Sequence, residues 1–137
     1  MPLVDTSVWI HALCPGGNAS IRSLLRPLIV SRDAAVTEWV LLELMTGLRA
    51  SEAPGTLLRW FAPIARLPFD DGWWPRAWDN AARLRKRGVS PTAVDCLIAT
   101  VAIEHRVPLV HCDADFEGMK PALPLVTLDW SRHLGGG

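Results

Sequence analysis

Apolar residues follow two patterns along the chain, and together these predict short strands that alternate with helices. Short apolar runs are typical of strands buried in a sheet, and they occur at 3–4, 34–37, 64–67, 108–110 and 125–127. Apolar residues spaced three and four apart predict amphipathic helices, over 18–29, 37–49, 56–61, 73–87 and 90–105. This alternation predicts an α/β fold with a three-layer α/β/α architecture, in which helices cover a parallel sheet of four to five short strands.

Length and composition suit one domain with a sizeable core, because half of the 137 residues are hydrophobic. We expect that domain to span residues 1–132, followed by a flexible glycine-rich tail at 133–137. No apolar run is long enough to cross a bilayer, and no leader precedes Asp5, so we expect a soluble cytoplasmic protein without a membrane partner. Three cysteines without CxxC spacing argue against both a disulfide framework and a zinc site.

Acidic residues occur at the ends of two predicted strands. Asp5 ends the first strand and leads directly into a helix that Thr6 or Ser7 can cap. Asp113 and Asp115 follow the strand at 108–110 and precede a short helix. Because ligands bind at the carboxyl ends of parallel strands, we expect these acids to share one site.

Two further acids lie within predicted helices. Glu43 stands in the apolar stretch 41–45, where an unpaired buried carboxylate is costly. It should therefore be exposed, paired or bound to a cation. Asp95 lies in the first turns of the helix at 90–105, beside its apolar positions.

Each acid also has a purely structural interpretation. Asp95 fits a capping box that begins at Thr92, and this is the favoured interpretation for Asp95 alone. Asp5 suits helix entry equally well, and Asp113 with Asp115 could form a solvated turn. Together, however, the acids would repel one another, and a divalent cation makes such a cluster tolerable. Oxygen-only ligation favours Mg²⁺ or Mn²⁺ over zinc.

The balance of charge changes if these acids are gathered in one place. The chain has 14 basic and 14 acidic residues. Setting aside the five acids named above leaves nine acidic residues against 14 basic ones. An acidic pit in a mildly basic surface suits the binding of a phosphate polymer through cations.

Four acidic segments resemble the motifs of PIN domains, most closely those of VapC-type toxins of bacterial toxin–antitoxin modules. They are Val4-Asp-Thr-Ser7, Glu43-Leu-Met-Thr-Gly-Leu-Arg49, Thr92-Ala-Val-Asp-Cys-Leu-Ile-Ala99 and Leu109-Val-His-Cys-Asp-Ala-Asp-Phe116. The likeness covers almost the whole chain, with the motifs in the same order. Each motif is weak alone, and the set is specific.

The resemblance implies a Mg²⁺-dependent endoribonuclease, with Mn²⁺ able to substitute, in which a metal-activated water attacks the RNA phosphodiester. It implies a catalytic quartet of Asp5, Glu43, Asp95 and Asp113. Metal ligands would be Asp5, Asp95, Asp113 and Asp115, and Ser7 would support Asp5. His111 departs from the pattern, because PIN domains often have Thr or Ser at that place.

The resemblance also implies partners, namely an RNA substrate, a VapB-like antitoxin whose tail covers the acidic pit, and a second copy in a homodimer. Basic residues that could contact RNA are Arg49, Arg83, Arg85, Lys86 and Arg87. For four of them, at 83 and 85–87, the favoured interpretation is a solvated helix end, because cations suit a helix C-terminus. For the tryptophans we favour core packing, then a surface for a partner, then base stacking, at Trp60, Trp73, Trp74 and Trp78.

Two other functions fit parts of the pattern. A PIN-fold module that binds RNA or protein without cutting would share the fold, but it would have little reason to keep five costly carboxylates together. A phosphatase with a D-x-D nucleophile would carry that pair after its first strand, whereas Thr6 and Ser7 follow Asp5 here. We therefore favour the ribonuclease.

Overall fold

The computed structural model describes residues 1–47 and 52–136 and shows a sheet of five parallel strands. The strand order is β3-β2-β1-β4-β5, which places β1 at the centre. The strands are β1 (Leu3–Val4), β2 (Ala35–Val36), β3 (Ala65–Arg66), β4 (Leu109–His111) and β5 (Thr127–Asp129). The predicted parallel sheet of four to five strands is thus confirmed, at the predicted places in the chain.

Two strand boundaries differ from the prediction. β4 continues to His111, and β5 begins at Thr127, two residues later than predicted. The pairing of the two strands explains both shifts, because Leu109 lies opposite Thr127 and His111 lies opposite Asp129. Hydrophobicity did not reveal this register, since Leu125 is buried although it precedes the strand.

Helices follow each strand, and several of the helix N-termini carry polar caps. Asn18, Thr37 and Thr92 each accept a hydrogen bond from a backbone N–H in the first turn of a helix. The helices are α1 (Thr6–Leu13), α2 (Ala19–Val30), α3 (Glu38–Thr46), α4 (Pro54–Phe61), α5 (Trp74–Lys86), α6 (Ala93–His105) and α7 (Ala114–Met119), with short 3₁₀ helices η1 (Asp71–Trp73) and η2 (Ser131–Gly136). None of those formed by the described residues is long and apolar enough to cross a membrane.

The third predicted helix ends earlier than expected. It was predicted over 37–49, but α3 ends at Thr46 and Gly47 is its C-cap. The Gly47 N–H closes the helix by donating to the carbonyls of Glu43 and Leu44. Arg49 lies outside the described residues.

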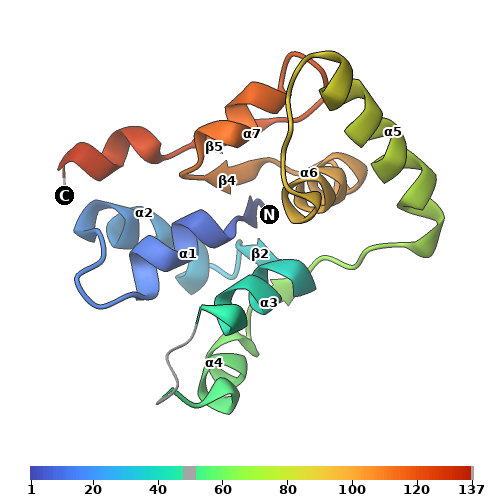
Figure 1. Ribbon diagram of the computed structural model, residues 1–137. Helices are drawn as coiled ribbons and strands as arrows, with labels where there is room; N and C mark the ends of the chain where they lie inside the picture. Colours follow the sequence, from blue (N-terminus) through green and yellow to red (C-terminus); the bar gives the residue numbers. More distant parts are fainter. Residues whose placement is uncertain (48–51, 137) are drawn as a thin grey trace.

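The sheet separates two groups of helices (Figure 1). α1 and α2 lie on one side of it, and α5 and α6 lie on the other. Right-handed crossovers produce this arrangement, because the chain moves from β1 to β2 in one direction and from β3 to β4 in the other. The predicted three-layer α/β/α architecture is confirmed.

The core lies on both faces of the central strands. Leu3, Val4, Leu109 and Val110 are fully buried. Such continuous burial is typical of parallel strands that helices cover on both faces. Trp9 of α1 is also fully buried, and its indole N–H donates to the carbonyl of Val4 at 3.1 Å.

The tryptophans predicted to pack in the core do so only in part. Trp60 is 44 % exposed and meets the buried Trp9 edge to face. Trp73 and Trp74 pack on Phe69, and Trp78 is 66 % exposed. Trp74 is also exposed, at 38 %, and Trp73 is half-buried.

Residues 133–136 belong to η2, which packs against α2. The flexible tail expected at 133–137 stays a prediction. The Asn18 side chain donates to the carbonyl of Leu134 at 3.0 Å, and Leu134 is partly buried against the core. A single domain over residues 1–132 stays a prediction.

Candidate active site

Asp5 stands where β1 ends and α1 begins. Its Oδ2 accepts hydrogen bonds from the backbone N–H of Ser7 at 3.0 Å and from the Ser7 hydroxyl at 2.6 Å. Asp5 is therefore itself the N-cap of α1, in place of the predicted Thr6 or Ser7. Helix entry and a place in the acidic site, which the sequence left as alternatives, are combined in one residue.

The Asp5 carboxylate is only 4 % exposed. Its Oδ1 is buried and accepts no hydrogen bond from the part of the chain that the structure describes. Burial raises the pKa of Asp5, the hydrogen bonds from Ser7 oppose this, and the nearby charge of Asp113 adds to the rise. A buried carboxylate oxygen without a partner needs either a proton or a cation.

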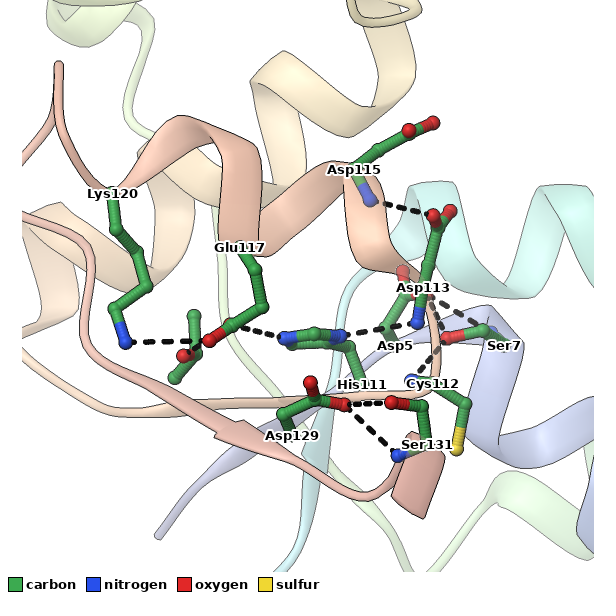
Figure 2. Close-up of polar contacts among 11 residues, drawn as sticks. Asp5, Ser7, His111, Cys112, Asp113, Asp115, Glu117, Lys120, Asp129 and Ser131 are labelled. Carbon is green, nitrogen blue, oxygen red and sulfur yellow. Dashed lines mark hydrogen bonds and ion pairs between the residues drawn. The ribbon is translucent and has the colours of Figure 1, made fainter. Parts of the chain in front are cut away.

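Ser7 connects the two strand ends that carry acids. Its hydroxyl donates to Asp5 Oδ2 and accepts the backbone N–H of Cys112, which follows β4, at 2.9 Å. Figure 2 shows Ser7 between Asp5 and the Cys112–Asp113 turn. The serine thus sets the position of the two acidic segments relative to each other.

Glu43 is paired, which is one of the three outcomes expected of it. Its Oε1 accepts a hydrogen bond of 2.7 Å from the hydroxyl of Thr6, and the side chain is half-buried. Sequence analysis missed this role of Thr6. The two residues are 37 positions apart, so only packing of α1 against α3 reveals the contact.

Asp95 combines the two interpretations that the sequence left open. The Thr92 side chain accepts the backbone N–H of Asp95 at 3.1 Å, which confirms the helix cap. The half-buried carboxylate is still part of the acidic cluster. Burial raises the pKa of Asp95 to about 6, and the charges of Asp5, Asp113 and Glu43 add to the rise. The predicted quartet is therefore brought together.

Asp113 and Asp115 begin α7. Asp113 is the N-cap, and its Oδ1 accepts the backbone N–H of Asp115 at 2.9 Å. Asp115 itself is exposed. Ligand oxygens of Asp95, Asp113 and Asp115 lie within 4.8 Å of one another, which is close enough to hold one metal ion.

A second polar group, formed by His111, Glu117 and Thr127, adjoins the backbone of Asp113. Of these three residues, sequence analysis singled out only His111. The fully buried His111 ring lies 2.8 Å from Glu117 Oε2 through Nε2 and 3.1 Å from the Asp113 nitrogen through Nδ1. Thr127 donates to the same Glu117 oxygen at 2.6 Å. No local motif marks Glu117 or Thr127, because the pairing of β4 with β5 brings them together.

The basic residues predicted to contact RNA lie at the end of α5. Arg83, Arg85 and Lys86 occupy its last turn, and Arg87 is its C-cap. All four are exposed, and Arg83 pairs with Asp79 at 3.0 Å. Their position satisfies the helix C-terminus interpretation, and the RNA contact stays a prediction.

Comparison with known families matches residues 3–120 to the PIN domain. Ribonuclease VapC11 of Mycobacterium tuberculosis is 32% identical over 122 residues, which cover 85% of this chain and 90% of that protein. The chain is a PIN domain of the VapC family. VapC ribonuclease Mb1587 of Mycobacterium bovis matches to the same extent.

Solved structures share the fold of this PIN domain. VapBC2 from Rickettsia felis, bound to a DNA fragment from its promoter, superposes with a TM-score of 0.77 at 20% identity. The match covers 93% of this chain and 97% of that one. VapBC-5 from Mycobacterium tuberculosis has a TM-score of 0.66 at 24% identity, over 93% of this chain and 97% of that one.

An apolar groove adjoins the acidic cluster of the PIN domain. It has a volume of about 720 Å³ and lies between α1, α3 and α4. Ile10, Leu13, Leu57 and Trp60 contribute to its walls, and Glu43 lies at its border with the acids. The groove could therefore hold an apolar segment that reaches toward the carboxylates.

Proposed function

We propose that the protein is a Mg²⁺- or Mn²⁺-dependent endoribonuclease that acts as the toxin of a toxin–antitoxin pair. The observation that carries the proposal is the buried Oδ1 of Asp5, which has no hydrogen-bond partner among the described residues although the charges of Asp95 and Asp113 act on the same carboxylate. Relatives that are 32% identical over most of their length are named ribonucleases. RNA cleavage is the chemistry that this family membership and the acidic cluster jointly support.

A divalent cation fits the residues that are present. It would be held by Asp95, Asp113 and Asp115, whose ligand oxygens lie within 4.8 Å of one another, and Asp5 would join them as the buried neighbour whose charge acts on Asp95. The ligand atoms are all carboxylate oxygens, which hard ions such as Mg²⁺ and Mn²⁺ prefer. A cation would also offset the repulsion from neighbouring carboxylates, which adds to the effect of burial in raising the pKa of Asp95.

The side chains divide the work of phosphodiester hydrolysis. When bound, the cation lowers the pKa of a coordinated water and stabilises charge on the phosphoryl oxygens. Ser7 keeps Asp5 Oδ2 engaged, so that Oδ1 is the free ligand atom. Thr6 holds Glu43 at the edge of the cluster, and Asp95 or Asp113 orients the attacking water.

The proposed partners follow from the surfaces around the site. The apolar groove beside Glu43 suits the tail of a VapB-like antitoxin, which would cover the acids. The exposed cations at the end of α5 would contact the RNA backbone in the cytoplasm. Exposed indoles such as Trp78 offer a surface for a second copy in a homodimer.

Removal of single acids tests the enzymatic proposal. Asp5→Asn and Asp95→Asn should each lower the rate of RNA cleavage in Mg²⁺ about 100-fold or more, because each removes a charged ligand from the transition-state environment. Asp71→Asn, at an exposed acid of η1, is the matched control and should cleave as the wild type does. Circular dichroism should show the same fold for all the variants.

Unchanged RNA cleavage by both Asp5→Asn and Asp95→Asn would refute the proposed enzymatic activity. Calorimetry with Mn²⁺ then separates it from a PIN-fold module that binds without cutting. The enzyme should bind the ion and unfold at a higher temperature in its presence. Absence of both effects would favour the module.

A further inference from the structure

A buried histidine supports the turn that carries Asp113. His111 is the last residue of β4, and its ring is fully buried against Phe116. Figure 2 shows a continuous line of contacts from Lys120 through Glu117 and His111 to the backbone of Asp113. The functional roles described above do not include this line of contacts.

The contacts determine which ring nitrogen carries the proton. The Asp113 backbone N–H can only donate, and it lies 3.1 Å from His111 Nδ1, so that nitrogen must be unprotonated. Nε2 then carries the hydrogen and donates it to Glu117 Oε2 at 2.8 Å. A carboxylate on the far side of a histidine fixes its tautomer and ring orientation in this way.

Glu117 is itself held as a carboxylate. Its Oε2 also accepts the Thr127 hydroxyl at 2.6 Å, and the Lys120 ammonium lies 3.4 Å from Oε1. Burial acts to raise the pKa of Glu117, but the hydrogen bonds from Thr127 and His111 outweigh it and hold that pKa below its usual value. An ionised Glu117 is a strong acceptor for the Nε2 hydrogen.

The same residues do not form a second metal site. Ligand atoms of His111, Glu117 and Asp129 lie within 4.8 Å of one another. However, both nitrogens of His111 are engaged, and Asp129 Oδ1 accepts the backbone N–H and the hydroxyl of Ser131 at 2.9 and 2.6 Å. The His111 ring therefore has no lone pair left for an ion, so we describe the group as a support network.

The turn after β4 depends on two side chains. The strand ends at His111, so the next two backbone N–H groups find their partners outside the sheet. Ser7 accepts the N–H of Cys112 and His111 accepts the N–H of Asp113. Ser7 also fixes Asp5, so these two acceptors together set where the Asp113 carboxylate lies relative to Asp5.

We propose that His111 is a positioning residue, which fixes Asp113 by accepting its backbone N–H at Nδ1 while Glu117 fixes the tautomer. The inference rests on the proposed function, because Asp113 is positioned there for metal binding and RNA cleavage. It gives His111 a role that depends on one acceptor atom and not on the size or polarity of the ring. Two substitutions can therefore separate that atom from the rest of the side chain.

His111→Asn and His111→Gln form the decisive pair. The Asn amide oxygen replaces Nδ1 and keeps an acceptor for Asp113, whereas the Gln amide replaces Nε2 and keeps only the contact with Glu117. His111→Gln should lower kcat about 10- to 100-fold and weaken Mn²⁺ binding by a similar factor, the usual cost of losing support behind a metal ligand. His111→Asn should stay within about threefold of the wild type, although both variants lose the ring that packs on Phe116.

Nitrogen NMR of the wild-type protein tests the tautomer without any measurement of activity. The signals of His111, assigned by their loss in His111→Asn, should show an unprotonated Nδ1 and a protonated Nε2. Glu117→Ala should weaken this preference, because only the Asp113 N–H then opposes a protonated Nδ1. A protonated Nδ1 in the wild type would overturn the proposal, and so would equal losses in Mn²⁺ affinity for the Asn and Gln variants.

These readouts separate the two proposals. If the wild type binds Mn²⁺ but cuts no RNA, the proposed function fails, while weaker Mn²⁺ binding by His111→Gln alone still supports the positioning role. If the wild type cuts RNA and the Asn and Gln variants cut equally poorly, the positioning role fails and the ribonuclease stands.

Discussion

Two aspartates show how burial changes the chemistry of one local motif. Asp5 and Asp129 each end a strand and each accept the N–H and the hydroxyl of the serine two positions later. The hydrogen bonds from Ser131 lower the pKa of Asp129, whereas burial outweighs those from Ser7 and raises the pKa of Asp5. The same sequence pattern therefore stabilises a carboxylate at one strand end and leaves an unsatisfied one at the other.

Asp95 makes the stability of the metal-free protein depend on pH. Its pKa is raised from 3.8 to about 6, so the folded state binds the proton more tightly than the unfolded state does. The stabilising contribution of the protonated group is complete below about pH 4 and is lost as the pH rises through about 6. Asp95→Asn should therefore raise the melting temperature of the metal-free protein by about 3–5 °C at pH 7.5. Calorimetry in EDTA at several pH values measures this.

The gain from Asp95→Asn should shrink toward zero near pH 4, where the wild-type carboxyl is protonated as well. Glu52→Gln, at an exposed acid, is the control and should show no such trend. A variant that is less stable than the wild type at pH 7.5 would contradict a raised pKa of Asp95 in the folded protein.

Two of the acids lie at junctions between a strand and a helix. At each junction the same aspartate caps the helix and contributes a carboxylate to the site. Asp5 and Asp113 follow the strands β1 and β4 and also cap the helices that come next. In α6 the two tasks are divided, because Thr92 provides the cap and the Asp95 carboxylate remains free to join the cluster. Capping patterns in the sequence are thus compatible with a functional site at the same residues.

The cap of α6 can be tested alone because Thr92 is exposed and its hydroxyl accepts the N–H of Asp95. Thr92→Ala should lower the free energy of unfolding by about 1 kcal/mol, since it leaves the Asp95 N–H without an acceptor in the helix. Thr92→Ser keeps the hydroxyl and should retain most of that stability. Urea unfolding measures both, and an equal loss in the two variants would exclude the cap as the cause.

Sheet order brings together segments that are far apart in the chain. β1 lies between β2 and β4, so Asp5 meets the acids that follow β4 more than 100 residues later. β5 then adds Thr127 to the support of His111, and η2 closes the chain against α2. The end of the chain is thus part of the fold that holds the site.

Deletion of the chain end tests this arrangement. Loss of residues 131–137 removes Ser131, whose hydroxyl donates a hydrogen bond to Asp129. It also removes the partly buried Leu134 and its hydrogen bond with Asn18. We expect the free energy of unfolding to fall by about 2 kcal/mol. Deletion of 135–137 alone leaves those contacts and should have little effect. Equal stability of the two truncated proteins would support the flexible tail that the sequence predicts.

Local sequence already determines most of the elements and the acids of the site. Short apolar runs, helical spacing and caps depend on neighbouring residues, so strands, helices and the strand-end acids Asp5 and Asp113 could be predicted from them. Glu43 could be predicted because a carboxylate in an apolar helix must find a partner. Tertiary structure alone decides which partner that is, and Thr6 provides it from 37 residues away.

Tertiary structure also decides the pKa values of the acids and the contacts that hold the site in place. The register of β4 with β5, the network of His111 with Glu117 and Thr127, and the packing of η2 all join residues that no local pattern links. Burial, which raises the pKa of Asp5 and Asp95, is likewise a property of the packed chain. Local sequence places Asp5 and Asp113 directly after strands, and only the folded protein brings Asp113 close to Asp95 and Asp115.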